Sequence, residues 1–139
     1  MRPFFCFILM TGLSGSICEK RVAPFVPDSH SFVLGDTLVV RIAETWADES
    51  NTISVRFDSM AEDSRCPLHV ECFWQGNAKA MLTCVSGTGH AEFGLNTYSG
   101  FPRDTTVFGR DVTLIDVMPY PVWQVPISKE DYSVKLVVK

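Results

Sequence analysis

Apolar and polar residues alternate along most of the chain from Ser31 onward. The clearest alternating runs are 37–46, 52–60, 78–85, 90–95 and 132–138. Alternation with a period of two is typical of antiparallel strands that bury one face and expose the other. The side chains expected on the buried faces of the first four runs are Leu38, Val40, Ile42, Ile53, Val55, Phe57, Ala78, Ala80, Leu82, Cys84, Ala91, Phe93 and Leu95. No window of 11 or more residues has helical periodicity, so the pattern predicts an all-β protein.

Turn-forming residues separate these runs at intervals of about 8 to 12 residues, a spacing typical of sandwiches and barrels. The turn signals stand at 35–36, 48–51, 86–89 and 109. The signal at 86–89 predicts a hairpin, and Gly109 interrupts a strand pair. We therefore predict that residues 31–139 form a single antiparallel β-sandwich of about seven to eight strands, with an open β-barrel as the alternative.

The middle of the chain interrupts the alternation and concentrates turn-forming residues. Pro67 fixes its own φ and lacks an amide donor, so we expect a tight loop there. Cys66 and Cys72 bracket this loop and are expected to form a disulfide, which would stabilise the fold by about 2 kcal/mol because the ring that it closes is short. Asp63 and Arg65 are expected to form a local ion pair that fixes the loop.

Beyond the proline, the alternation from Leu68 to Trp74 predicts that a strand resumes. Trp74 would then share a face with apolar neighbours and act as a core anchor. Gly76-Asn77 marks either a tight hairpin turn or a bulge, and the sequence leaves both open.

The first 17 residues have the organisation of a secretory signal peptide, with Arg2 followed by an apolar run and then by small residues. The apolar run is too short to span a bilayer, which needs about 20 residues. The sequence leaves two kinds of processing open, which are ordinary cleavage after Ser16 and lipidation of Cys18. Without a lipid, Cys18 is a partner for Cys84 or a free thiol. Residues 18–30 are expected to form an extended lead-in to the domain.

The charge balance is acidic. Removing the signal peptide takes away Arg2 and no other charged side chain, so the net charge changes from −4 to −5 (−4 minus the +1 of Arg2). The chain also lacks a Lys/Arg cluster that could neutralise phosphates, so nucleic acid is not expected as a partner. About 120 residues remain, enough for one domain with its own core. We expect this domain in the periplasm or cell envelope, in contact with the membrane only through a lipid at Cys18.

The patterns that could carry catalysis or bind metal are incomplete. His69-Val70-Glu71 is similar to the His-x-Glu of zinc deaminases, but the downstream Pro-Cys-x-x-Cys is absent. Cys84 lies on the apolar face of a predicted strand, where burial raises the pKa of a thiol and reduces its reactivity. No Gly-x-Ser-x-Gly elbow is present in the mature chain, and the acidic residues near Asp63 lack the pattern of a calcium loop. We therefore predict no catalytic residue, metal site or cofactor.

Aromatic residues stand in or beside the predicted loops. Phe101, Tyr120 and Trp123 have prolines as near neighbours, and exposed aromatic side chains of this kind commonly contact proteins, peptides or sugars. The alternative is that Tyr120 and Trp123 fold back and close one end of the sandwich. Phe101, Tyr120 and Trp123 are the candidate binding residues.

The middle of the chain also carries a motif. Asp63-Ser64-Arg65-Cys66-Pro67 is followed by Val70, Cys72, Trp74, Gly76 and Ala78. This motif resembles the signature of a family of small bacterial envelope proteins, often lipoproteins, whose function is unknown. The residues similar to that family's C-terminal pattern are Leu114, Pro119-Tyr120-Pro121, Asp131-Tyr132, Val134, Leu136 and Val138. The resemblance covers about two-thirds of the mature chain and implies no catalytic residue, cofactor or substrate.

Together these patterns predict an exported envelope protein that is a non-enzymatic binding module. The expected partner is a protein or peptide of the cell envelope. A protease inhibitor that inserts a rigid loop into its target is the alternative. A hydrolase is a third class, and the missing catalytic motif argues against it.

Overall fold

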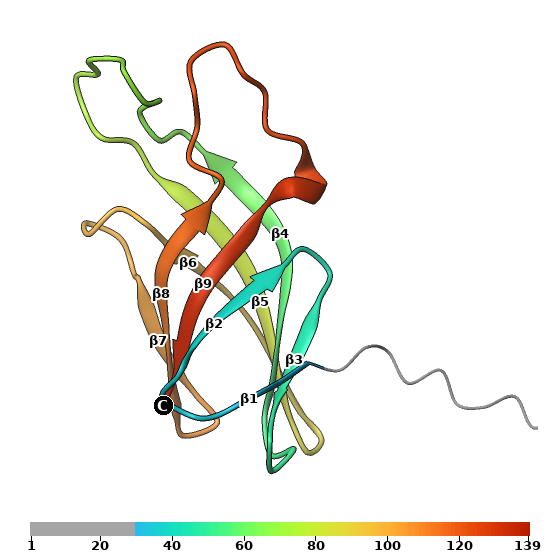
Figure 1. Ribbon diagram of the computed structural model, residues 1–139. Helices are drawn as coiled ribbons and strands as arrows, with labels where there is room; N and C mark the ends of the chain where they lie inside the picture. Colours follow the sequence, from blue (N-terminus) through green and yellow to red (C-terminus); the bar gives the residue numbers. More distant parts are fainter. Residues whose placement is uncertain (1–29) are drawn as a thin grey trace, which may run out of the picture.

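The computed structural model describes residues 30–139, which form two facing β-sheets (Figure 1). The first sheet has the strand order β1 (His30–Phe32), β3 (Thr45–Asp48), β4 (Ser54–Asp63), β5 (Ala78–Ser86) and β6 (Gly89–Asn96). The second has the order β2 (Thr37–Arg41), β9 (Ser133–Val138), β8 (Arg110–Met118) and β7 (Asp104–Val107). A 3-10 turn, η1 (Lys129–Asp131), precedes β9.

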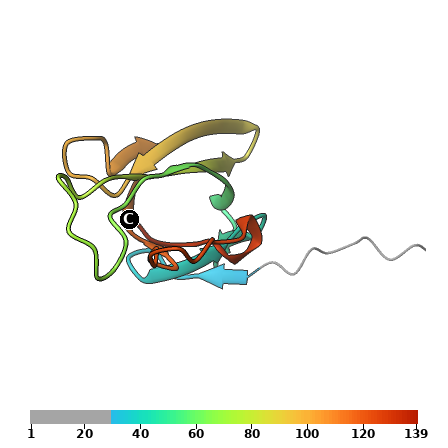
Figure 2. The ribbon, with the colours of Figure 1, turned by 90° about the horizontal axis from the view of Figure 1, so that it is seen from above.

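The prediction of an all-β sandwich is confirmed. All strand pairs are antiparallel except β1 with β3, which run parallel. A view along the strands shows the two layers lying over each other (Figure 2), and the two sheets keep separate strand orders instead of closing into one barrel.

The predicted strand over 37–46 is two strands in different sheets. The chain leaves β2 in the second sheet and enters β3 in the first, and Ala43 stands between them with φ of 64°. The amide of Ala43 donates to the carbonyl oxygen of Phe57 at 2.7 Å, which fixes the crossing. The alternation of side chains could not show this change of sheet, because alternation does not specify which sheet a strand joins.

The core fills the space between the sheets. Its fully buried side chains come from both layers and include Val40, Val55, Phe57, Leu82, Cys84, Leu95, Val112, Leu114, Val117, Val134, Leu136 and Val138. Burial of each large apolar side chain contributes about 1.5–3 kcal/mol, so this cluster is the main source of stability. Ala91 and Phe93 are only partly buried, because they lie on β6 at the edge of the first sheet.

The hairpin predicted at 86–89 is present between β5 and β6. The β7–β8 pair is interrupted as predicted, at Phe108-Gly109. These residues have φ of 51° and 72°, as the tight turns that suit twisted antiparallel strands require.

The predicted signal peptide (1–17), Cys18 and nearly all of the lead-in at 18–30 lie outside the described residues. Within residues 30–139, no helix is long and apolar enough to cross a membrane.

One buried carboxylate organises the turn between β3 and β4. Asp48 Oδ1 accepts hydrogen bonds from the amides of Thr52 (2.6 Å) and Ile53 (2.7 Å). The hydroxyls of Ser50 and Thr52 donate to Oδ2. Burial by itself would raise the pKa of Asp48, but these hydrogen bonds outweigh burial and hold the pKa far below its ordinary value of 3.8.

The stability of the fold should therefore depend on Asp48 in a pH-dependent way. The folded state binds a proton on this carboxylate more weakly than the unfolded state, so the contribution is complete above a pH of about 4 and is lost as the pH falls below it. We expect Asp48→Asn to lower the free energy of unfolding by about 1–3 kcal/mol at neutral pH, since buried amides lose a charged acceptor. Urea unfolding of both proteins should show this difference shrinking below a pH of about 4.

The matched control is Asp104→Asn, which changes an exposed carboxylate on β7. Its effect should stay within about 0.5 kcal/mol. A difference between wild type and Asp48→Asn that is constant with pH would contradict this account of the turn.

Candidate functional site

Three loops meet at one end of the sandwich. They are the β4–β5 loop (64–77), the β6–β7 loop (97–103) and the β8–β9 loop (119–132). In Figure 1 the first and third extend above the sheets, in yellow-green and red-orange. We call this region the loop end.

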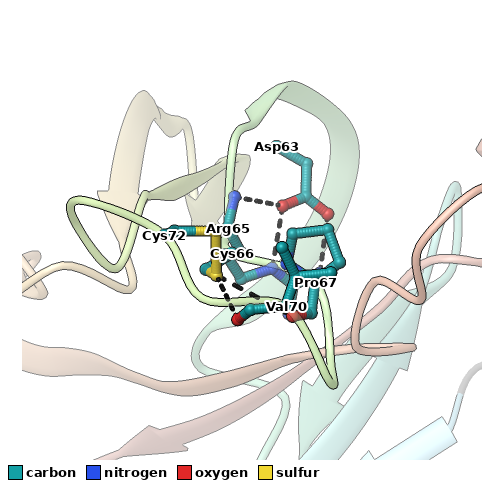
Figure 3. Close-up of a disulfide and its surroundings, with 6 residues drawn as sticks. All are labelled: Asp63, Arg65, Cys66, Pro67, Val70 and Cys72. Atoms are coloured by element: carbon teal, nitrogen blue, oxygen red, sulfur yellow. Dashed lines mark hydrogen bonds and ion pairs between the residues drawn. A yellow bond between two sulfur atoms is a disulfide. The ribbon is translucent and has the colours of Figure 1, made fainter.

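The predicted disulfide is present in the β4–β5 loop. Cys66 and Cys72 are bonded, with their Cα atoms 5.9 Å apart (Figure 3). Disulfides form and persist mainly outside the reducing cytoplasm, so this bond indicates an oxidising, exported location. The amide of Leu68 donates to the carbonyl oxygen of Pro121 at 2.9 Å, which joins the disulfide loop to the β8–β9 loop.

The strand predicted from Leu68 to Trp74 does not form. Residues 64–77 contain an isolated bridge between Leu68 and Val122 but no strand. His69 has φ of 63°, which breaks an extended chain, and the disulfide closes the segment into a ring. An alternating pattern predicts a strand only where a neighbouring strand can pair with it, and here the adjacent backbone belongs to a loop.

The predicted ion pair between Asp63 and Arg65 is present and buried. Arg65 donates to Asp63 through Nε (2.8 Å to Oδ1) and Nη2 (2.6 Å to Oδ2), as Figure 3 shows. The other guanidinium hydrogen bonds go to the carbonyl oxygens of Val117 and Pro119. One side chain thus ties the end of β4 to the end of β8 and to the start of the β8–β9 loop.

Two aromatic residues complete this contact. The ring of Tyr120 lies over the guanidinium of Arg65, 5.0 Å from its carbon to the ring centre, and the hydroxyl of Tyr132 donates to Asp63 at 3.0 Å. Burial alone would raise the pKa of Asp63, but the hydrogen bonds and charge of Arg65 hold it below its ordinary value. Burial and the negative charge of Asp63 raise the pKa of Tyr132. Asp63 is therefore ionised and Tyr132 protonated at neutral pH.

Asn77 holds the other side of the loop end. Its side-chain amide donates to Glu62 (2.8 Å) and to Asn96 (3.0 Å), and its side-chain oxygen accepts from the amide of Tyr98. Asn96 in turn donates to the carbonyl oxygen of Pro102. Asn77 and Asn96 are buried, and within the described chain no buried side-chain nitrogen or oxygen lacks a partner. The base of the β4–β5 loop is thereby bonded to the β6–β7 loop.

Gly76-Asn77 forms neither of the features proposed from the sequence. These residues lie at the neck of the β4–β5 loop, where the amides of Ser64 and Cys66 donate to the carbonyls of Asn77 (2.7 Å) and Gln75 (2.9 Å). Gly76 has φ of 75°, and a Cβ there would lie 1.9 Å from the carbonyl oxygen of Ser64. Only glycine fits, because any side chain would force the two sides of the neck apart.

The three predicted binding residues all lie at the loop end, but they do not form one cluster. Phe101 is 48% exposed and Trp123 is 60% exposed. Tyr120 is 37% exposed, because its ring covers Arg65. Trp123 is next to Gln124, which has φ of 61°, in a turn closed by the amide of Val125 and the carbonyl of Val122 (3.0 Å). The turn therefore presents the indole to solvent.

The prediction that Trp74 is a core anchor is wrong, and the sequence pattern did not identify it as a surface residue. It is 50% exposed and meets Tyr98 edge to face, with ring centres 5.8 Å apart. Tyr98 meets Phe101 in the same way at 5.5 Å. Trp74, Tyr98 and Phe101 thus form an aromatic cluster. Further exposed apolar side chains of the loop end are Leu68, Phe73, Val122 and Val125.

A groove of about 210 Å³ lies beside Tyr120 at the loop end. Its lining residues are Arg65, Gln75, Gly76, Thr97, Asp116 and Tyr120. The groove is therefore formed by all three segments that Arg65 and Asn77 hold together, namely the β4–β5 loop, the start of the β6–β7 loop and the end of β8 with Tyr120.

The residues considered as catalytic or metal-binding candidates lie in different parts of the domain. Cys84 is fully buried, and burial together with the charge of Asp58 raises its pKa to about 12, so it stays a thiol. His30 stacks on Trp46, its pairing partner on β3, and His90 lies near Glu92. In the described part of the chain, no group of three or more His, Cys, Asp or Glu is placed to hold a metal ion.

Comparison of this chain with protein-family models, with curated proteins and with solved structures finds no match. The resemblance of the central motif to envelope proteins therefore stays a prediction.

The buried ion pair should be a large contributor to stability. Arg65→Met would leave the Asp63 carboxylate buried without its cation, so we expect the free energy of unfolding to fall by about 3–5 kcal/mol. The control is Arg56→Met, which removes the exposed partner of Asp58, 3.7 Å away, and should cost no more than about 1 kcal/mol. Urea unfolding of both variants measures the difference, and equal losses would contradict the assigned role of Arg65.

The disulfide should contribute less. The Cys66→Ala, Cys72→Ala double variant is expected to lose about 2 kcal/mol, since a short ring restrains the unfolded chain only modestly. Wild type unfolded in the presence of a reductant should match the variant. A loss as large as that of Arg65→Met would show that the disulfide, and not the ion pair, holds the loop end together.

Proposed function

We propose that this protein is an exported, non-enzymatic binding module of the cell envelope whose loop end binds another protein or peptide. The observation that carries the proposal is the exposure of Trp74, Phe101 and Trp123 on loops that are fixed by buried polar contacts. Tryptophan, tyrosine and arginine are the residues that most often dominate the energy of protein interfaces. A monomeric domain has no folding reason to expose so many large apolar side chains at one end.

The rigidity of the loop end supports binding over a merely solvated set of loops. Arg65 and Asn77 join all three loops through buried hydrogen bonds, and the disulfide closes a ring within the β4–β5 loop. Side chains that are already ordered lose little conformational entropy when a partner docks, so more of the contact energy appears as affinity. A protein or peptide offers the apolar groups that such a surface can bury.

In the same proposal, the protein resides in the periplasm or cell envelope, either free after cleavage at Ser16 or attached to the membrane only by a lipid at Cys18. The predicted signal peptide and the disulfide support this location. Proteins that share the central motif would share the scaffold, since Asp63, Arg65, Cys66, Cys72 and Gly76 all serve the architecture of the loop end.

A protease inhibitor remains the second candidate. The turn from Val122 to Val125 presents Trp123 at its apex, and a rigid protruding turn is suited to insertion into a cleft. A panel of envelope proteases assayed with and without the protein separates this candidate from binding of other kinds.

The test is affinity capture from envelope extracts with wild type and a Phe101→Ala, Trp123→Ala double variant. Loss of two exposed anchors should weaken capture of the specific partner by at least about 30-fold, equivalent to 2 kcal/mol. The control is Phe108→Ala, because Phe108 is similarly exposed (44%) but lies in the β7–β8 turn at the opposite end. Circular dichroism should show that all variants are folded. Equal capture by the double variant and the control would reject the loop end as the binding surface.

A further inference from the structure

The outer edge of β6 is the longest unpaired strand edge among the described residues. Among residues 30–139, β6 pairs with β5 alone. It has eight residues, whereas the other edge strands, β1, β2 and β7, have three, five and four. A long unpaired edge offers a row of free amides and carbonyls to another strand, and proteins usually shorten or cover such edges.

The pairing with β5 shows which backbone groups face outward. The amide of Thr97 donates to Ala78 of the β5 side, whereas the amide of Asn96 donates away from β5, to Pro102. Backbone groups alternate in direction along a strand. The amides and carbonyls of His90, Glu92 and Gly94 therefore point away from the sheet, while those of Ala91 and Phe93 bond to β5.

We propose that β6 is a homodimerisation edge, which pairs antiparallel with β6 of a second copy of this chain about a two-fold axis at Ala91. In this register His90 lies opposite Glu92 of the second copy, and Glu92 lies opposite His90. Both residues have outward backbone groups, so each pair exchanges two hydrogen bonds. A two-fold axis makes the contact close on itself, so pairing stops at a dimer.

The side chains favour this register. His90 and Glu92 are exposed on the outer face, with side-chain exposures of 58% and 70%, so the imidazole of one copy can donate to the carboxylate of the other in each pair. Ala91 meets Ala91 on the axis, where the strands approach most closely and small side chains fit best. A register centred on Glu92 would instead place two carboxylates directly opposite each other, which destabilises a strand pair.

The occupant favoured by this complementarity is a second copy and not a foreign strand, because the same two side chains supply both halves of the contact. The surface is separate from the loop end, and neither proposal depends on the other.

The test is sedimentation velocity of the mature chain over a concentration series, with variants that act on the edge alone. Wild type should sediment as a dimer. Glu92→Pro removes an outward amide without removing a hydrogen bond to β5, and should weaken dimerisation at least about tenfold. The control is Thr106→Pro, which places proline at the equivalent outward position of edge strand β7 and should leave the dimer intact.

A charge exchange tests the register. His90→Glu places like charges opposite each other and should dissociate the dimer, and adding Glu92→Lys to that variant should restore it. Circular dichroism and thermal melts establish that each variant is folded. A wild type that is monomeric at every concentration overturns the proposal. So does a dimer that survives both Glu92→Pro and His90→Glu, and so does a failure of the double exchange to restore pairing.

Discussion

The structure depends most on the burial of one positive charge, the guanidinium of Arg65. A buried charge without partners costs several kcal/mol, so the chain must supply acceptors wherever this side chain is placed. Asp63 supplies a carboxylate from two residues away, and Val117 and Pro119 supply carbonyls from more than fifty residues further along the chain. The cation therefore holds together segments from both sheets, because separating them would leave it unpaired.

On the other side of the loop end, the buried side chain of Asn77 likewise needs hydrogen-bond partners. An amide side chain has two donor hydrogens and one acceptor oxygen, and here Glu62, Asn96 and Tyr98 use them. Arg65 joins the β4–β5 loop to the β8–β9 loop, and Asn77 joins it to the β6–β7 loop, so movement of the β4–β5 loop breaks hydrogen bonds to both others. This coupling keeps Trp74, Phe101 and Trp123 exposed in a fixed arrangement, although exposed aromatic side chains on free loops would collapse onto the nearest apolar surface.

The candidate site was predictable only where local composition was sufficient. Phe101, Tyr120 and Trp123 stand beside prolines in segments without alternation, so their place in loops could be read locally. Trp74 lies in a segment that does alternate, and the pattern wrongly placed it in the core. Its contact with Tyr98 crosses from one loop to another, and periodicity carries no information about such contacts. The same holds for the edge position of β6, since its alternation is like that of β5.

By itself the sequence determined the all-β class, the position of most turns, most of the core-facing residues and the Cys66–Cys72 bond. Each of these depends on residues close together in the chain, through side-chain alternation, turn propensity or ring closure. Only the tertiary structure decided the division of 37–46 between two sheets, the partners of Arg65 and Asn77, and which strands lie at the edges. These features depend on which backbone groups, distant in the chain, lie next to each other in the fold. Burial requires that Arg65 and Asn77 have hydrogen-bond partners, but the sequence does not reveal which residues supply them.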